Sequence, residues 1–324
     1  MSRERWLDPS WRADALDWVD DRLATLGRVR TGEPEQPHVR PWATALRIPT
    51  DRGPVWLKAS AKGTAYEHGL LQVLADVAPD LVLAPLAGDT DRAWSLLPDG
   101  GTTLRTWLAE HEDERFRCWA EVLREHAALQ RATAPAVGQL LAAGTPDLRP
   151  SAVEGLVESV LGDPSIDLSL RRRAEQEWSP RMAEVAAALA GSPVPASIQH
   201  DDLHDANVLL NGASYRVFDW GDASVSHPFG VFLVLRRALA SSAGVDEHGP
   251  ELTRLQDTYL ECFSDLAPRS ELVIDLRRAE YVAGLGRICS WRRALLTATP
   301  EEQSEYAAAD SGWLAICVDR PPPP

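Results

Sequence analysis

The residues with the clearest capacity for chemistry lie in one short stretch, residues 198–223. There His200, Asp202 and Asn207 follow the spacing His-x-Asp-x4-Asn, and Asp219 comes soon after them. Phosphoryl transfer needs a carboxylate that positions the acceptor, and oxygen ligands for a Mg2+ that neutralises the phosphates. Asp and Asn side chains provide such oxygens, which a hard cation such as Mg2+ prefers. The pattern therefore predicts a phosphotransfer site.

A predicted β-hairpin explains how these side chains could meet. Residues 207–210 and 215–218 have β character, and the turn dipeptide Asn211-Gly212 lies between them. Antiparallel pairing of the two runs would bring Asn207 and Asp219 to the same edge of the hairpin. We therefore expect the two side chains to be neighbours in the folded chain.

The rest of the chain changes from β-rich to helical character at a cluster of turn formers, residues 98–101. Before this cluster we predict helices over 16–26 and 64–77, and strands over 43–48, 55–59, 81–83 and 93–97. After it we predict helices over 104–110, 114–131, 152–161, 168–189, 229–240, 251–266 and 271–296. This order favours an α+β fold with a small β-rich lobe followed by a larger α-rich lobe.

The stretch 198–223 resembles the catalytic and metal-binding motifs of the protein-kinase superfamily. It is more similar to those of the aminoglycoside phosphotransferase family of small-molecule kinases, in which a His-Gly-Asp-Leu-His-x-x-Asn-type loop precedes an Asp-Trp segment. The resemblance implies a protein-kinase-like two-lobed fold. It also implies that Asp202 is the catalytic base, that Asn207 and Asp219 are Mg2+ ligands, and that His200 organises the catalytic loop.

The resemblance continues upstream, where Lys58 lies in a predicted strand and Glu67 on the following helix. The chain has only two lysines, and a lysine in a buried strand is costly to desolvate unless it is paired. The two residues resemble the phosphate-contacting lysine and its ion-pair partner. Residues 94–98, with Ser95 and Leu97, resemble the hinge whose backbone groups hydrogen-bond adenine.

These similarities imply a small-molecule kinase with Mg2+ as cofactor, ATP as phosphoryl donor and a small-molecule hydroxyl as acceptor; GTP stays open as the donor. Residues 1–97 would form an N-terminal helix plus the nucleotide-binding lobe, and residues 98–324 the helical lobe with the catalytic loop and substrate site. The acceptor could be an aminoglycoside or amino sugar, although choline, homoserine, fructosamine and sugar kinases share the same motifs.

Two features depart from the family pattern. No Gly-x-Gly-x-x-Gly sequence precedes Lys58, and residues 32–42, which we expect to cover the phosphates, hold one glycine. Asp201 stands where the family usually has a glycine. Counting back from Asn207 selects Asp202 as the catalytic carboxylate, so we expect Asp201 to contact substrate or solvent.

Composition and net charge indicate which classes of partner the protein is expected to bind. The formal net charge of −15 disfavours a nucleic-acid partner and is compatible with a cationic acceptor. No apolar run approaches the length of a membrane span, so we expect no membrane partner. The four cysteines form no Cys-x-x-Cys pair and the N-terminus does not resemble a secretion signal, which favours a cytoplasmic location.

Two rival functions remain. The His200-Asp201 dipeptide with His204 is compatible with a metal-dependent phosphohydrolase, which predicts an all-helical site with further histidines. The alternative is a catalytically silent nucleotide-binding module, in which replacing Asp202 would change nothing.

Overall fold

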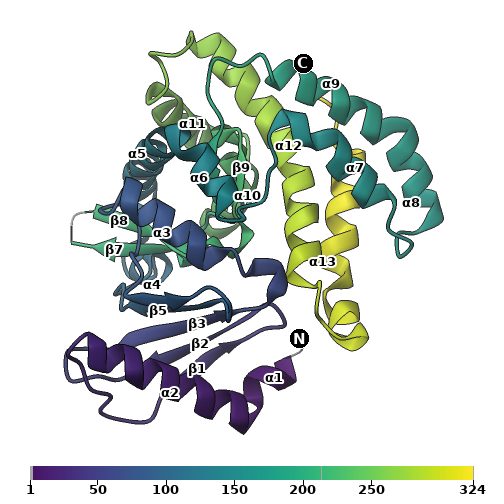
Figure 1. Cartoon of the computed structure of the whole chain (residues 1–324). Coiled ribbons are helices and arrows are strands. Elements are labelled where there is room, and N and C mark those ends of the chain that lie inside the picture. The colour runs from purple at the N-terminus through teal and green to yellow at the C-terminus, as the bar shows by residue number, and fades with distance from the viewer. Residues whose placement is uncertain (1–2, 213, 324) are drawn as a thin grey trace.

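A five-stranded antiparallel sheet forms the smaller of two lobes in the computed structural model, which describes residues 3–212 and 214–323 (Figure 1). The strand order is β1-β2-β3-β5-β4. The strands are β1 (Glu35–Val39), β2 (Ala43–Ile48), β3 (Val55–Ser60), β4 (Ala87–Asp89) and β5 (Trp94–Pro98). Side chains alternate between the two faces of each strand, so Leu57 is buried on the outer side while Lys58 faces the larger lobe.

The N-terminal helices α1 (Arg3–Leu7) and α2 (Pro9–Thr25) cover the outer face of this sheet (Figure 1). The tryptophans of α2 pack edge to face with Trp94 of β5: the ring centroids of Trp18 and Trp94 are 5.6 Å apart. Together with the apolar strand residues they form a hydrophobic core separate from that of the larger lobe. The outer face of the sheet is thus closed, and its other face is left for the site.

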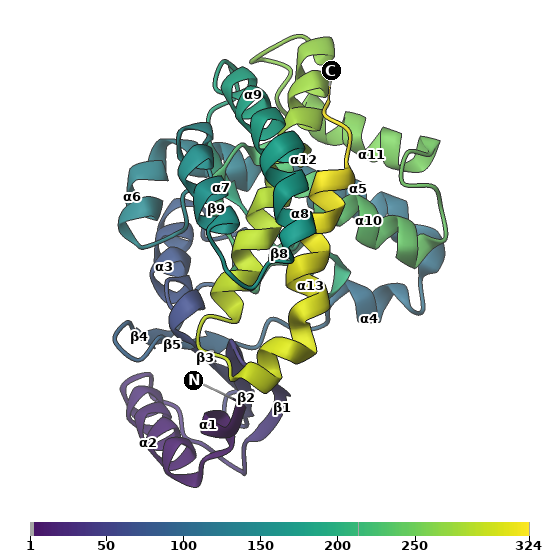
Figure 2. The same cartoon turned by 90° about the vertical axis from the view of Figure 1, so that its right-hand side faces the viewer.

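The larger lobe is mostly helical (Figure 2). Its helices are α4 (Leu104–Leu108), α5 (Arg115–Thr133), α6 (Val137–Ala142), α7 (Val153–Leu161), α8 (Leu168–Arg173), α9 (Ser179–Leu189), α10 (Phe232–Ala243), α11 (Pro250–Glu261), α12 (Arg269–Ala294) and α13 (Pro300–Asp319). Two short antiparallel pairs lie within it: β6 (Ser197–Gln199) with β9 (Ser224–Ser226), and β7 (Val208–Asn211) with β8 (Ser214–Val217).

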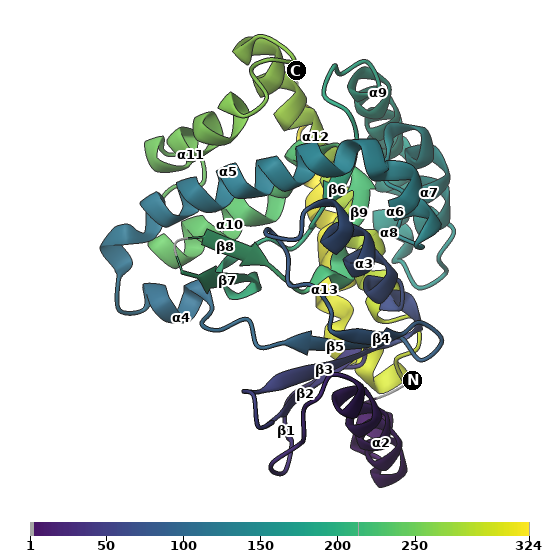
Figure 3. The ribbon, with the colours of Figure 1, turned by 60° about the vertical axis from the view of Figure 1, so that its left-hand side comes forward.

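The hairpin β7–β8 lies between α4 and α5 (Figure 3). Its register pairs Val208, the first residue of β7, with Val217, the last residue of β8. Asn207, just before β7, and Phe218, just after β8, are therefore neighbours. The Phe218 amide donates to the Asn207 carbonyl at 3.1 Å, which extends the pairing. This confirms the predicted hairpin and brings the segment that carries Asp219 back to the catalytic loop.

The helix α3 (Glu67–Val77) links the lobes. It follows the sheet strand β3 in the chain, yet Leu70, Leu71 and Leu74 belong to the hydrophobic core of the larger lobe. Its first residue, Glu67, therefore sits at the junction between the two lobes. The division of the chain at residues 97 and 98 stays a prediction.

The two-lobed α+β architecture is confirmed, and several local predictions are corrected. Residues 81–83 form no strand, because Val82 makes only an isolated bridge to Val217. The run predicted as one helix over 168–189 is interrupted by a π-helical turn at 174–178. The strands β1, β4 and β9 and the helices α1, α6 and α13 were not predicted. In the part of the chain that the structure describes, no helix combines the length and the apolar character needed to cross a membrane.

Candidate active site

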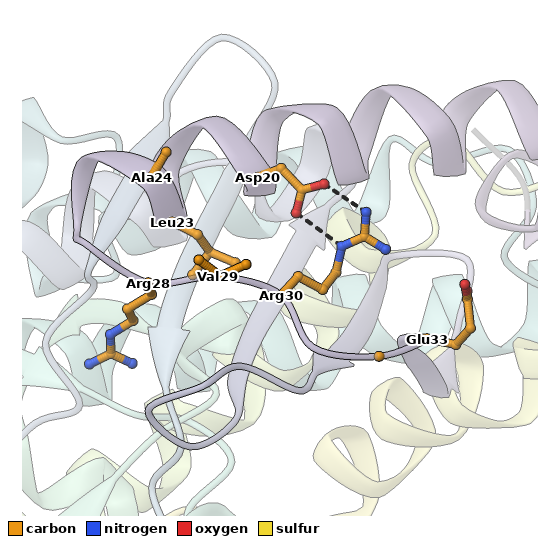
Figure 4. Close-up of a pocket in the computed structure, with 8 residues that line it drawn as sticks. Asp20, Leu23, Ala24, Arg28, Val29, Arg30 and Glu33 are labelled. Carbon is orange, nitrogen blue, oxygen red and sulfur yellow. Dashed lines mark hydrogen bonds and ion pairs between the residues drawn. The ribbon is translucent and has the colours of Figure 1, made fainter.

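A cavity of about 590 Å3 lies where the two lobes meet. The sheet contributes Lys58 and Leu97 to its wall, the segments around β6 to β8 contribute Asp202 and Asp219, and α12 contributes Arg287. A second hollow of about 550 Å3 lies between α2 and residues 28–33 (Figure 4). It holds an ion pair between Arg30 and Asp20 at 2.6 Å but none of the predicted site residues. We therefore place the candidate site in the cavity between the lobes.

Lys58 of β3 contacts acidic residues from two other segments, the start of α3 and the segment after β8. Its Nζ lies 2.6 Å from Oε1 of Glu67 and 2.6 Å from Oδ1 of Asp219. Glu67 Oε1 also accepts the backbone N–H of Trp220 at 2.9 Å. Burial disfavours the charged amine, but the charges of Asp219 and Glu67 outweigh it and raise the pKa of Lys58. The lysine is therefore a fixed cation, and the predicted ion pair with Glu67 is present.

His200 connects the catalytic loop to the segment before Asp219. Its Nδ1 accepts the Asp202 amide at 3.3 Å, so its Nε2 carries the proton and donates to the Phe218 carbonyl at 2.9 Å. Burial lowers the pKa of this imidazole, which keeps it neutral. Its geometry is that of a residue that holds the loop in place, as the resemblance implied.

Asp202 points into the cavity, with 26% of its side chain exposed. Its Oδ2 lies 3.5 Å from Nε2 of His204, and its Oδ1 lies 3.5 Å from Nη2 of Arg287. Burial would raise the pKa of this carboxyl, but the His204 hydrogen bond and the Arg287 charge lower it to about 2. Asp202 is accordingly ionised and available to a hydroxyl group in the cavity.

Asp219 and Asn207 are the predicted metal ligands. Asp219 adopts a left-handed backbone conformation with φ of 64° and leaves 48% of its side chain exposed. Burial opposes ionisation here as well, but Lys58 lowers the pKa of Asp219. Asn207 donates through Nδ2 to the Asp202 carbonyl at 3.0 Å, which directs its amide oxygen away from that bond.

Asp219 and Asn207 suit Mg2+ by the chemistry of their oxygens, but they are only two ligands. One carboxylate and one amide oxygen are hard ligands, and Mg2+ commonly takes few protein ligands when phosphate oxygens and water complete its shell. No group of three or more His, Cys, Asp or Glu residues with metal-binding geometry occurs in the described ranges. The residues present therefore suit a cation that arrives with a triphosphate better than one held by the protein alone.

The predicted hinge needs a correction at Ser95. In β5, Ser95 is paired with Gly88 on one side and Lys58 on the other, which engages its backbone in the sheet. Its buried hydroxyl lies 3.0 Å from Nδ1 of His68, and it does not line the cavity. Leu97 does line it, beyond the last residue of β5 that pairs with β4. The backbone facing the cavity is that of the segment after Leu97, residues 98–101.

The expectation that Asp201 meets substrate or solvent is wrong. Asp201 is 3% exposed and its Oδ2 accepts the hydroxyl of Ser224 on β9. Its backbone is left-handed, with φ of 61°, and burial raises its pKa to about 7 against the opposing effects of Ser224 and Arg287. The Asp201 side chain thus points into the larger lobe. Of the two adjacent aspartates, only Asp202 lines the cavity.

Arg287 and Asp222 are the site residues that sequence reasoning missed or undervalued. Both line the cavity, and Nη1 of Arg287 lies 3.3 Å from Oδ2 of Asp222. Helix α12 carries five further arginines, so nothing in the sequence distinguishes Arg287 from them: Arg269, Arg277, Arg278, Arg292 and Arg293. Asp222 follows Asp219 by three residues, and its spacing alone assigns it no role.

Comparison with known proteins places these residues in a family context. The model of the phosphotransferase enzyme family matches residues 39–232. This range contains the lysine strand, the catalytic loop and the hairpin, but not Arg287. No curated protein matches the sequence.

Several solved structures share the fold over nearly the whole chain. A choline/ethanolamine kinase family protein from Mesorhizobium loti is 15% identical, covers 95% of this chain and 96% of its own, and has a TM-score of 0.59. The macrolide 2'-phosphotransferase of Brachybacterium faecium is 16% identical, with 95% and 99% covered and a TM-score of 0.52. The ethanolamine kinase of Plasmodium vivax is 8% identical, with 89% and 82% covered and a TM-score of 0.60. These similarities confirm the kinase-like fold.

Proposed function

The chain belongs to the phosphotransferase enzyme family, and from this premise we propose that it transfers the γ-phosphoryl group of ATP to a hydroxyl group of a small molecule. The observation that carries the proposal is the convergence of Lys58, Asp202 and Asp219 on one cavity between the lobes. Catalysis of phosphoryl transfer consists mainly of positioning and of neutralising phosphate charge. Lys58 supplies positive charge for the phosphates, and the two ionised carboxylates can position an acceptor hydroxyl and a metal ion.

Each residue has a distinct role in this proposal. Asp202 orients the acceptor hydroxyl and receives its proton, since its carboxylate is ionised and faces the cavity. Lys58 binds phosphate oxygens, and Glu67 keeps its ammonium group in place. Asn207 and Asp219 would hold Mg2+, which when bound neutralises the phosphate charge.

The nucleotide base would lie against Leu97 and the backbone of residues 98–101. At Gly100 this segment passes close to β7, since an added Cβ would lie 2.2 Å from Leu209 Cδ1. The backbone at this point therefore approaches the hairpin β7–β8 closely at the edge of the cavity. ATP and GTP are to be compared directly as donors.

The acceptor is proposed to be cationic. The net charge of −15 and the carboxylates of Asp202 and Asp222 in the cavity wall favour a positively charged molecule over an anion. Trp42 and Trp291 also line the cavity and can contact an alkylammonium group through their rings. Choline, ethanolamine, a macrolide and an aminoglycoside form a suitable first panel.

The test is a transfer assay with the whole protein, Mg2+ and ATP or GTP labelled at the γ-phosphate. Label should move to at least one acceptor of the panel, and Asp202→Asn should abolish this transfer while MgADP still binds. A silent nucleotide-binding module would bind MgADP with no turnover. A phosphohydrolase would release phosphate from phosphorylated substrates without a nucleotide. Either result would replace the kinase proposal.

A further inference from the structure

Arg287 contacts the catalytic loop from a helix far along the chain. Its Nη1 donates to the Asp201 carbonyl at 3.1 Å, and its Nη2 lies 3.5 Å from Oδ1 of Asp202. The same guanidinium lies 3.3 Å from Oδ2 of Asp222, in the segment that follows Asp219. One planar side chain therefore bridges two carboxylates, each of which lines the cavity.

Small residues on α12 allow this close approach. An added Cβ at Gly286 would lie 2.7 Å from Leu148 Cδ2 and 3.4 Å from Asp201 Oδ1. At Gly284 it would lie 2.6 Å from Cys317 Sγ of α13. Both glycines are inside the helix, where glycine is less favourable than alanine. At Gly286 the helix thus lies next to Leu148 and to Asp201 of the catalytic loop, one residue before Arg287, and at Gly284 it packs closely on α13.

Burying the charged side chain of Arg287 costs free energy of folding. The residue is 6% exposed, and its Nε has no hydrogen-bond partner among the described residues. A buried charge is costly even when it is paired, and replacing such a group by an apolar one often preserves stability. Packing alone therefore gives little reason for an arginine at this position, whereas its two carboxylate partners do.

We propose that Arg287 is a positioning residue for phosphoryl transfer: it anchors the carboxylate of Asp202, and Asp222 fixes the guanidinium in the orientation that allows this. The inference rests on the proposed function. Loss of Arg287 leaves the Asp202 carboxylate with His204 as its side-chain partner in the described part of the chain, so the carboxylate can turn away from the acceptor hydroxyl. A small misplacement of a catalytic group is enough to slow a reaction greatly.

The experiment measures turnover and nucleotide affinity of Arg287→Met, which keeps the length and removes the charge. Because the catalytic carboxylate loses its anchor, kcat should fall about 10- to 100-fold, while KM for MgATP and the affinity for MgADP stay close to wild type. Asp222→Asn should lower kcat in the same direction by a smaller factor. In the double variant the two effects should be less than additive, because they remove parts of one arrangement.

Arg236→Met is the matched control. Arg236 is also buried, with 8% of its side chain exposed, and pairs with Glu280 at 3.0 Å, but it does not line the cavity. Its loss should lower the melting temperature and leave kcat per folded molecule unchanged. This comparison separates a loss of stability from a loss of positioning.

Arg287→Lys keeps the charge but cannot bridge both carboxylates, and it decides the matter if Arg287→Met does not fold. A folded lysine variant with wild-type kcat overturns the inference, as does an unchanged kcat in Arg287→Met. The proposed function is judged separately by wild type and Asp202→Asn in the same assay. If wild type transfers no phosphate both conclusions fall, whereas a defect in Asp202→Asn with normal Arg287 variants overturns this inference only.

Discussion

The ammonium group of Lys58 lies 2.6 Å from the carboxylate of Asp219, although the two residues are 161 positions apart in the sequence. One comes from the sheet of the small lobe and the other from the end of a hairpin in the large lobe. Their ion pair joins the two lobes in the wall of the cavity. Since Asp219 is also the proposed metal ligand, a bound Mg-nucleotide would have to share it with Lys58.

We expect Lys58→Met to reduce both nucleotide affinity and stability. Glu67, with 4% of its side chain exposed, would keep hydrogen bonds from Trp220 and Ser60 as its remaining partners among the described residues. Removing one partner of a buried ion pair typically costs about 3 kcal/mol or more of unfolding free energy. Denaturant unfolding and MgADP titration measure the two effects.

Lys62→Met is the natural control for Lys58→Met, because Lys62 is the chain's other lysine and is exposed. It should match wild type in both measurements. Wild-type MgADP affinity in a folded Lys58→Met variant would remove the small lobe from the proposed phosphate site.

Asp202 and Asp219 should give opposite phenotypes. Asp219→Ala removes the proposed metal ligand and should abolish Mg-dependent nucleotide binding, so titration with MgADP should show no saturation. Asp202→Ala should leave MgADP affinity nearly intact and lower kcat by several orders of magnitude, because it acts on the acceptor hydroxyl. The reverse pattern would mean that the two roles are exchanged.

The sequence was sufficient for the parts of the site that depend on local spacing. Asp202, Asn207 and Asp219 lie on one loop and one hairpin, and their relative placement follows from the turn chemistry and the pairing of β7 with β8. Lys58 could be identified from the sequence because the chain has only two lysines, so a lysine within a predicted strand stands out. Glu67 could be predicted because it begins the next helix.

Other features depend on packing that no local pattern records. Arg287 reaches the loop only because α12 crosses it, and one arginine among six in that helix carries no distinguishing signal. Asp201 turns inward because its backbone is left-handed, which alternation and hydropathy do not predict. Helix α13 was missed because its run of small and polar residues gives a weak amphipathic pattern, and the capping box between Thr299 and Glu302 was overlooked.

The buried Asp201 should make the folded protein more stable at mildly acidic pH. Burial raises its pKa from 3.8 to about 7. Between these two values the folded state holds a proton that the unfolded state releases, so unfolding free energy falls as pH rises from about 4 to 7 and changes no further from this group above that. The slope corresponds to about 1.4 kcal/mol for each pH unit at most.

Asp201→Asn and Asp201→Gly should both flatten this dependence. Glycine also relieves the left-handed backbone, so Asp201→Gly should be the more stable of the two at pH 8. Denaturant unfolding of the three proteins at pH 5, 6, 7 and 8 provides the comparison. Equal slopes in wild type and Asp201→Asn would show that the carboxyl does not titrate in this range.

An aromatic cluster ties the edge of the small lobe to the C-terminal helices. Trp42, just before β2, contacts Trp291 of α12 with ring centroids 5.6 Å apart and Tyr306 of α13 at 5.1 Å, both edge to face. Trp42 ends the segment predicted to cover the phosphates. The cluster should therefore hold this segment over the cavity, since Trp42 and Trp291 both line it.

Trp42→Ala and Trp291→Ala should each destabilise the protein, and their effects should not add. An aromatic pair contributes about 0.5–1.5 kcal/mol beyond area burial, so the double variant should be less destabilised than the sum by about that amount. KM for MgATP should rise in both single variants because the covering segment loses its anchor. Trp107→Ala, which removes the ring of α4 that stacks on His111 beyond the end of that helix, should leave KM unchanged. Strictly additive unfolding energies with an unaltered KM would show that the cluster neither couples the lobes nor orders the cover.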